Sequence, residues 1–424
     1  MKPTALVLLF LNMFFHTQGL LPPKFQWKTI DFAWEGNRRE AAVASGDYIP
    51  ENNMPAGIAR WRDKVFITIP RWKKGVPSSL NYVYLNGSQS QPLHPYPSWN
   101  EGFVSEKSHK VTTNSTVVSA FRIFIDKCDR LWAVDNGVAD MSRELRQITE
   151  PAILIFDLKK NVLIHRYVID DEVLRDSTVL TSIVVDIAGK NCEDSFAYIP
   201  DMGSNALLVY SLRMKDVWRI ENHFFHFDPH EGVYRVGGVD FYWSDGISSA
   251  VLIPSKKGSG HSYLYFHPTS SRKLFRMSTK LLRDRNVPRE NIFSGVEVVG
   301  DRGEKSQATA IDYDHSNNVL FYTQLSKNGV SCWSVDQPLT PENVPLIISD
   351  CTILEFPNDI KVDHDSNLWI LSNRQSRFLY ESMDFDQINF RVLTAPTTTI
   401  LQGTACEKVS SLDRVLSFIK KKDK

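Results

Sequence analysis

Polar side chains occupy regular places in this sequence, at the ends of short apolar segments that are typical of β-strands. Four of them close such segments, namely Asp135, Asp201, Gln324 and Asn373. Others stand just before such segments, namely Asp245, Gln307, Thr309, Asn358 and Asp359. A carboxylate can remove a proton from carbon, and an amide or hydroxyl can stabilise an oxygen that gains charge. We therefore ask which elements would bring these groups together.

The apolar segments belong to a repeated strand–turn–strand pattern, which is clearest at residues 121–137. There Ile123 and Ile125 alternate with Arg122 and Asp126, which we interpret as the period-2 pattern of a half-buried strand. Residues 127–130 form a polar turn, and residues 131–134 form a second apolar strand. Related copies occur at 58–70, 183–201, 247–266, 310–324 and 359–373.

Six copies spaced roughly 50–65 residues apart predict an all-β fold, a six-bladed β-propeller with one blade per copy. Residues 25–34 are expected to supply a strand from one terminus that completes a blade begun by the other, since closure removes an exposed sheet edge. The end of the channel that gathers the loops of every blade is the default ligand site. The polar residues named above are predicted to ring that mouth. Asp126, Asp186, Asp312 and Asp363, in the turns, are instead expected to bond backbone amides.

Composition places the chain outside the nucleic-acid-binding and membrane-spanning classes. Its 424 residues hold 49 Lys and Arg against 49 Asp and Glu, and they include no run of 18 apolar residues. Residues 1–19 are predicted to be a signal peptide, because Lys2 precedes an apolar core and small residues follow it. Residues 20–406 would form the propeller, and residues 407–424 a basic, flexible tail. The protein is therefore expected to be secreted.

The five cysteines fit an oxidising compartment. Cys128 and Cys192 fall in corresponding turns of adjacent copies, which suits a bridge between blades, and Cys332 with Cys406 would tie the end of the chain to the fifth blade. Cys351 is left over and is expected to be a buried free thiol or, as the alternative, part of an intermolecular bridge. Asn86 and Asn114 begin glycosylation sequons.

The segment 221–240 carries several histidines and acids, but side chains three apart on a strand face opposite ways. His223 and His226 would therefore not converge on a metal ion, and no metal site is predicted there. No cofactor is expected, although a calcium ion in the channel stays compatible with the abundant Asp and Asn.

Many separated motifs resemble those of the insect yellow and major royal jelly protein family, in the family's order. They span about residues 25–406 and include 70–77 (PRWKKGVP), 95–99 (PYPSW), 128–135 (CDRLWAVD), 243–247 (WSDGI), 356–363 (FPNDIKVD), 368–374 (LWILSNR) and 403–406 (GTAC). The resemblance implies a secreted six-bladed propeller with the two disulfides proposed above.

The resemblance also implies a function in the melanin pathway, because some yellow proteins convert dopachrome to a dihydroxyindole. That tautomerisation needs a base, for which Asp135, Asp201 and Asp245 are the candidates, and a hydrogen-bond donor, for which Asn373 and Gln307 are the candidates. The dopachrome carboxylate would need a cation, and Arg374 and Arg71 are the candidates. Asp135→Asn is expected to leave folding intact. The sequence carries no independent catalytic motif, so enzymatic turnover itself is left open.

Two alternatives remain at this stage. Related salivary proteins bind biogenic amines at the channel mouth, and such a ligand would need polar groups for its ammonium and apolar walls for its ring. The residues predicted to bind a ligand are Gln307, Thr309, Asn358, Asn373 and Arg374. The other alternative is a structural protein of cuticle or eggshell. The partner predicted under the first two functions is a small aromatic molecule, either dopachrome or an amine.

Overall fold

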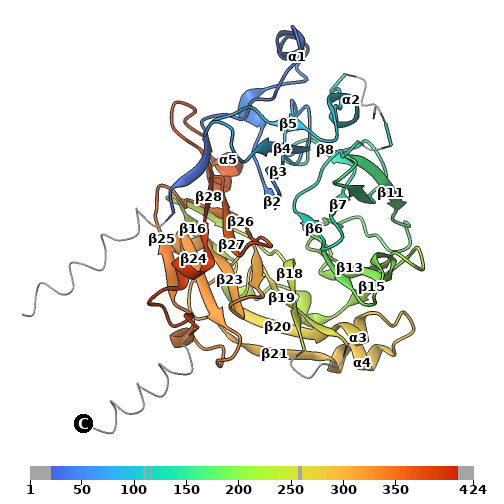
Figure 1. Ribbon diagram of the computed structural model, residues 1–424, viewed down its shortest axis with the longest axis vertical. Coiled ribbons are helices and arrows are strands. Elements are labelled where there is room, and N and C mark those ends of the chain that lie inside the picture. The colour runs from blue at the N-terminus through green and yellow to red at the C-terminus, as the bar shows by residue number, and fades with distance from the viewer. Residues whose placement is uncertain (1–20, 108–110, 112, 115, 256–259, 409–424) are drawn as a thin grey trace, which may run out of the picture.

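A computed structural model describes residues 21–107, 111, 113–114, 116–255 and 260–408. The signal-peptide prediction and most of the predicted tail lie outside these residues. Six four-stranded antiparallel sheets surround a central axis, so the predicted six-bladed propeller is confirmed (Figure 1). Among the described residues, no helix is both long enough and apolar enough to cross a bilayer.

Five blades use strands that are consecutive or nearly consecutive in the chain, ordered from the axis outward. The first three blades are β2 (Gly57–Trp61), β3 (Lys64–Thr68), β4 (Leu80–Tyr84) and β5 (His94–Pro95); β6 (Ile123–Ile125), β7 (Arg130–Asp135), β10 (Ala152–Asp157) and β11 (Val162–Val168); and β12 (Val184–Ile187), β13 (Ser195–Asp201), β14 (Ala206–Ser211) and β15 (Asp216–Glu221). The next two are β18 (Ile247–Pro254), β19 (Ser262–Pro268), β20 (Lys273–Ser278) and β21 (Val296–Asp301); and β22 (Ile311–Asp314), β23 (Val319–Gln324), β24 (Gly329–Ser334) and β25 (Leu346–Ser349).

The sixth blade closes the ring. It consists of β26 (Pro357–Val362), β27 (Asn367–Ser372), β28 (Phe390–Pro396) and β1 (Pro23–Trp27). The blue N-terminal strand therefore pairs antiparallel with the red β28 (Figure 1). Phe25 and Trp27 are buried in this blade, and burial of such side chains contributes roughly 1.5–3 kcal/mol each. The predicted closing strand is confirmed, but it ends at Trp27 instead of continuing to residue 34.

Inner strands β2, β6, β12, β18, β22 and β26 contact their neighbours around the axis. They run in the same sense, so one end of the channel collects the residues that precede them. We call that end the loop-side mouth, and we call the opposite end, where the inner strands turn into the second strands, the turn-side mouth.

Short helices and two β-hairpins lie outside the six blades in the described part of the chain. The helices are α1 (Arg38–Ser45), α2 (Trp99–Gly102), α3 (Thr279–Leu282), α4 (Arg289–Ser294), α5 (Gln375–Tyr380) and α6 (Thr397–Leu401). The 3-10 helices span Pro50–Asn52, Cys192–Asp194, His223–Phe225, Pro229–Glu231, Leu325–Lys327 and Pro341–Asn343. Two hairpins stand outside the blades, β8 (Val138–Ala139) with β9 (Arg146–Gln147), and β16 (Val233–Val236) with β17 (Val239–Tyr242). The strand assumed for His223 and His226 is thus wrong, because that segment turns twice as 3-10 helix before β16.

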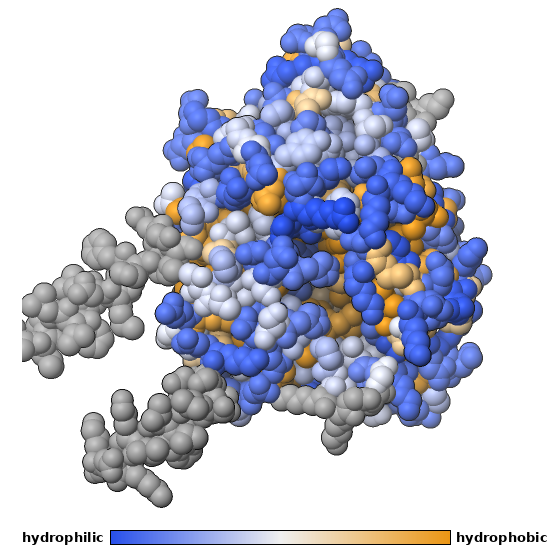
Figure 2. All heavy atoms as spheres, in the orientation of Figure 1, coloured by the Kyte–Doolittle hydropathy of each residue, from blue (hydrophilic) through white to orange (hydrophobic). Residues whose placement is uncertain are grey.

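Both predicted disulfides are confirmed, Cys128–Cys192 between the second and third blades and Cys332–Cys406 between the fifth blade and the end of the chain. Cys351 is free but exposed, so the expectation of a buried thiol is wrong. It lies in the turn just after β25, where Asp350 binds the amides of Thr352 and Ile353 and leaves the chain at the surface. Asn86 and Asn114 are exposed too. Figure 2 shows one face of the molecule, mostly hydrophilic, with apolar residues in the hollow near its centre.

Candidate functional site

A cavity of about 210 Å³ lies at the loop-side mouth. It is smaller than the roughly 300–1,000 Å³ that drug-sized ligands occupy, so it suits a small ring system. Three of the predicted residues line it, namely Asp245, Thr309 and Asn358. The sequence analysis did not select Arg122, Trp72, Trp243 or Tyr380, which line it as well.

Asp245 is the acid of this cavity. It stands in the loop between β17 and β18, two residues before Ile247 begins the inner strand. Its backbone carbonyl accepts a hydrogen bond from Ser270, while its carboxylate forms no hydrogen bond or ion pair with any described residue. Burial raises the pKa of Asp245 to about 6. An uncompensated carboxylate with a pKa near the working pH is the property expected of a general base.

Asp135 and Asp201, the other two candidate bases, are committed to the fold. The buried Asp135 carboxylate accepts hydrogen bonds from the backbone amides of Val118, Ser119 and Gly137, at 2.7–2.9 Å. Asp201 accepts a bond from the amide of Val179 and forms a 2.9 Å ion pair with Arg219. Each therefore holds the segment that leads into the inner strand of its own blade, and neither lines the cavity. The sequence analysis expected Asp135→Asn to leave folding intact. These hydrogen bonds instead lead us to expect that the substitution destabilises the fold.

Gln307 and Asn373, the predicted donors, are also used elsewhere. The Gln307 amide donates to the backbone and side-chain oxygens of Glu231, and the Asn373 amide donates to the carbonyl of Pro55 at 2.8 Å. Neither lines the cavity.

The predicted cations do not reach the cavity either. Arg374 donates to Asn389 and lies 3.3 Å from the Glu355 carboxylate. Arg71 is fully buried and donates to the carbonyls of Val117, Val118 and Pro77, so it is not available to a substrate carboxylate. Burial lowers the pKa of Arg71 to about 10.

Arg122 is the cationic side chain that lines this cavity. It lies at the start of the inner strand β6, with its Nε 3.3 Å from a carboxylate oxygen of Asp359 on β26. Its guanidinium donates to the carbonyl of Asn358 at 2.8 Å, which fixes its position. Burial lowers the pKa of Arg122, and the charge of Asp359 opposes that shift. The sequence held a signal for this pair, since Arg122 precedes Ile123 in one copy as Asp359 precedes Ile360 in another.

Two further predicted residues stabilise the walls of the cavity through hydrogen bonds between blades. The Thr309 hydroxyl contacts that of Thr323 at 3.0 Å and donates to the carbonyl of Pro357. The Asn358 amide donates to the carbonyl of Ala56 at 2.9 Å. These bonds join the fifth, sixth and first blades around the mouth.

Aromatic side chains form the outer walls. The Trp243 indole donates to the Tyr380 hydroxyl at 2.5 Å, linking the loop after β17 to α5. The Trp72 ring meets the Phe121 ring edge-on, with centroids 5.2 Å apart. Trp72 and Trp243 belong to the family-like segments quoted above, but nothing in those segments marks them as cavity residues. The described residues include no group of three metal-ligating side chains arranged to hold an ion.

The sequence is similar to known proteins along most of its length. A family model described as major royal jelly protein matches residues 118–406. A Drosophila melanogaster protein named dopaminechrome tautomerase is 34% identical over 399 residues, which is 91% of this chain and 84% of that protein. Protein yellow of the same species is 34% identical over 392 residues, which is 91% of this chain and 71% of that protein. Among solved structures, a luciferin-regenerating enzyme has 12% identity and a TM-score of 0.46, covering 82% of this chain and 94% of its own.

Proposed function

The chain belongs to the major royal jelly protein family, and from that premise we propose that it acts in the melanin pathway by converting an aminochrome quinone to a dihydroxyindole. The observation that carries the proposal is the carboxylate of Asp245, which lines a small cavity and has no partner among the described residues. Burial raises the pKa of this carboxyl group to about 6. The names of the relatives favour this function over the two alternatives, an amine binder or a structural protein of cuticle or eggshell.

The reaction is an isomerisation without net oxidation. A base removes a proton from one saturated ring carbon, the electron pair of that C–H bond moves into the ring, and a quinone oxygen gains the negative charge and is protonated. Loss of one proton from the adjacent saturated carbon and protonation of the second oxygen then give the aromatic dihydroxyindole, so that two carbon-bound protons are exchanged for two O–H protons. Catalysis therefore needs a base beside the carbon and a positive group near the oxygen.

Asp245 would be the base, and Arg122 would stabilise the oxygen as its charge grows. Both line the same cavity. Because Arg122 is held by Asp359 and by a backbone carbonyl, its charge is in place before the substrate arrives, and that preorganisation is what makes such a group effective. Trp72, Trp243 and Tyr380 would pack against the flat substrate.

A substrate carboxylate finds little support in this cavity. Arg374 and Arg71 lie outside it, and Arg122 already faces Asp359. This weakens the expectation for dopachrome, which carries a carboxylate. It favours an aminochrome without one, such as the dopaminechrome named for the Drosophila relative.

The same proposal includes secretion. Two disulfides fit an oxidising compartment, and the sequon residues Asn86 and Asn114 are exposed, as glycan attachment requires. A signal peptide at 1–19 would direct the protein there, and a small aromatic substrate would be its partner.

The test is the decay of dopachrome and of dopaminechrome, each followed by absorbance with purified protein against heat-denatured protein. We expect saturable acceleration with a dihydroxyindole as product, and faster turnover of dopaminechrome. A substrate deuterated at the ring carbon that loses its proton should react more slowly, which would place proton removal in the rate-limiting step. Decay that is no faster than with denatured protein, for both substrates, would contradict the proposal.

A further inference from the structure

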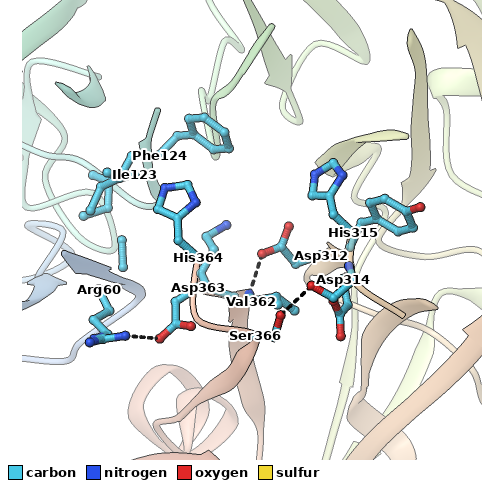
Figure 3. Close-up of a pocket in the computed structure, with 15 residues that line it drawn as sticks. Arg60, Ile123, Phe124, Asp312, Asp314, His315, Val362, Asp363, His364 and Ser366 are labelled. Carbon is cyan, nitrogen blue, oxygen red and sulfur yellow. Dashed lines mark hydrogen bonds and ion pairs between the residues drawn. The ribbon is translucent and has the colours of Figure 1, made fainter. Parts of the chain in front are cut away.

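A second cavity of about 210 Å³ lies at the turn-side mouth, separate from the cavity that holds Asp245. It is bounded by inner strands β2, β6, β22 and β26 and by the turns that follow β22 and β26. Figure 3 shows His364 and His315 on opposite sides of it, with Asp312 between them. The proposed function uses none of these residues.

Asp312 presents a carboxylate oxygen to this cavity. One oxygen accepts a hydrogen bond from the amide of Val362 at 2.7 Å, and the other points between His364 and His315 (Figure 3). The turn itself is capped by Asp314, which binds the amides of Ser316 and Asn317. Asp312 was predicted to bond backbone amides, and it does so, but the amide belongs to Val362 of the neighbouring strand β26 and not to its own turn. The copies explain why, because Asp314 aligns with Asp126 and Asp363, while Asp312 aligns with Phe124 and Lys361.

Lys361 supplies a positive charge to the same cavity. Its ammonium is 3.8 Å from the Asp359 carboxylate, a long contact that leaves its donors largely unused, and its side chain is 18% exposed. In the described part of the chain, Asp312 and Lys361 form no ion pair with each other within 4.0 Å. Two opposite charges thus line one small cavity without neutralising each other directly.

The opposite wall is apolar. Ile123, Phe124 and Ile125 of β6 line it, and Figure 3 shows the Phe124 ring directed toward the cavity. A ligand that satisfies all three features has an ammonium for Asp312, a carboxylate for Lys361 and an apolar group for β6.

We propose that the turn-side cavity binds a free α-amino acid with an aromatic or apolar side chain, its ammonium on Asp312 and its carboxylate on Lys361. This site is independent of the proposed function, because it shares no residue with the loop-side cavity. The ion pair Arg122–Asp359 lies between the two.

The experiment is isothermal titration calorimetry of the full-length protein with three matched ligands. Phenylalanine carries both charges, 2-phenylethylamine lacks the carboxylate, and 3-phenylpropionate lacks the ammonium. We expect phenylalanine to bind at least tenfold more tightly than either analogue. Absence of phenylalanine binding, or equal binding of one analogue, would overturn the proposal.

Variants locate the site. Asp312→Asn and Lys361→Gln should each weaken phenylalanine binding at least tenfold. Asp312→Asn should leave the weak binding of phenylpropionate unchanged, and Lys361→Gln that of phenylethylamine. Asp365→Asn is the matched control, since this exposed acid lies at the same mouth but not in the cavity. Loss of phenylalanine binding in Asp245→Asn would put the ligand at the other mouth and contradict the proposal.

A pH titration of wild-type protein tests the same contact without a variant. Burial raises the pKa of Asp312 to about 6, while the nearby Lys361 charge lowers it and that of Asp359 raises it. The other charged or titratable groups that line the cavity are Tyr313, Asp314, His315, His364 and the Arg60–Asp363 pair, and the residues of β6 and β18 include none. Phenylalanine affinity should fall as the pH drops through about 6. Affinity that is constant from pH 7.5 to 5 would contradict a contact with Asp312.

Discussion

The two mouths of the channel each hold one carboxyl group with a pKa raised to about 6, yet the two groups have different surroundings. Asp245 at the loop-side mouth is shifted by burial alone. Asp312 at the turn-side mouth is shifted by burial against a backbone hydrogen bond from Val362 and the charge of Lys361. A raised pKa therefore does not by itself identify a base.

The different surroundings of Asp245 and Asp312 suit the two carboxyl groups to different roles. A carboxylate without hydrogen bonds keeps its lone pairs for a proton from a substrate, which suits catalysis. A carboxylate beside a lysine that is not paired with it suits a ligand that bridges the two charges. The neighbouring acids at both mouths are committed to the fold, as Asp135 shows at one and Asp126 at the other, where it binds Cys128, Arg130 and Trp132.

The largest expected effect is on turnover. Asp245→Asn removes the base, so kcat for aminochrome decay should fall by roughly 10²–10³-fold. Asp365→Asn, an exposed acid at the other mouth, should keep kcat within about twofold. Equal activity of Asp245→Asn and wild type would remove the distinction between the mouths.

A second prediction separates the acids of the loop-side mouth by stability. In Asp135→Asn an NH2 group replaces one carboxylate oxygen and cannot accept the backbone hydrogen bonds made there. The free energy of unfolding should therefore fall by about 3 kcal/mol. Asp245→Asn should not lower the thermal midpoint at pH 7.5. Its raised folded-state pKa means that ionisation of Asp245 costs stability as the pH rises from about 4 toward 6, and the variant lacks that cost. Equal losses in both variants would show that Asp245 is also structural.

The pH profile gives a third measurement. Since Asp245 acts as a base only when ionised, kcat/KM should fall about tenfold per pH unit below about 6 and level off above it. The profile is measured with substrate decay corrected for the uncatalysed reaction at each pH. An activity that rises as the pH falls would point to an acid in place of a base.

The smallest effect concerns Lys361. Its charge holds the pKa of Asp312 down, so Lys361→Gln should raise that pKa above about 6, as followed by carbon NMR of the carboxyl group. The limb of the activity profile assigned to Asp245 should not move. A shift of that limb would show that the two mouths are electrostatically coupled through Asp359 and Arg122.

Much of the fold was predictable because its signals are local. The alternation around Ile123 and Ile125 specifies a strand wherever the strand lies, and the repetition of that pattern specifies the ring. The turn role of Asp126 and Asp363 followed for the same reason, since each binds amides within a few residues of itself. The Cys128–Cys192 bridge followed from corresponding turns of adjacent copies, whereas the Cys332–Cys406 bridge was expected as a tie between the end of the chain and the fifth blade.

The site was less predictable because its chemistry depends on which polar groups are left without partners. The structure places Asp245, Thr309 and Asn358 around one cavity, as the sequence analysis predicted. Nothing in the sequence favoured Asp245 over Asp135 and Asp201 as the base. Arg374 was a candidate cation for the dopachrome carboxylate, but its contacts with Asn389 and Glu355 hold it outside the cavity.

The sequence by itself determined six blades, their closure by the N-terminal strand and two disulfides. Tertiary structure alone decided that Asp245 is open, that Arg122 replaces Arg374 at the cavity, and that Asp312 faces Lys361. The physical reason is one of range. Side-chain alternation is set by neighbours in the chain, whereas hydrogen bonds and desolvation at the axis come from strands of different blades, such as those that carry Arg122 and Asp359.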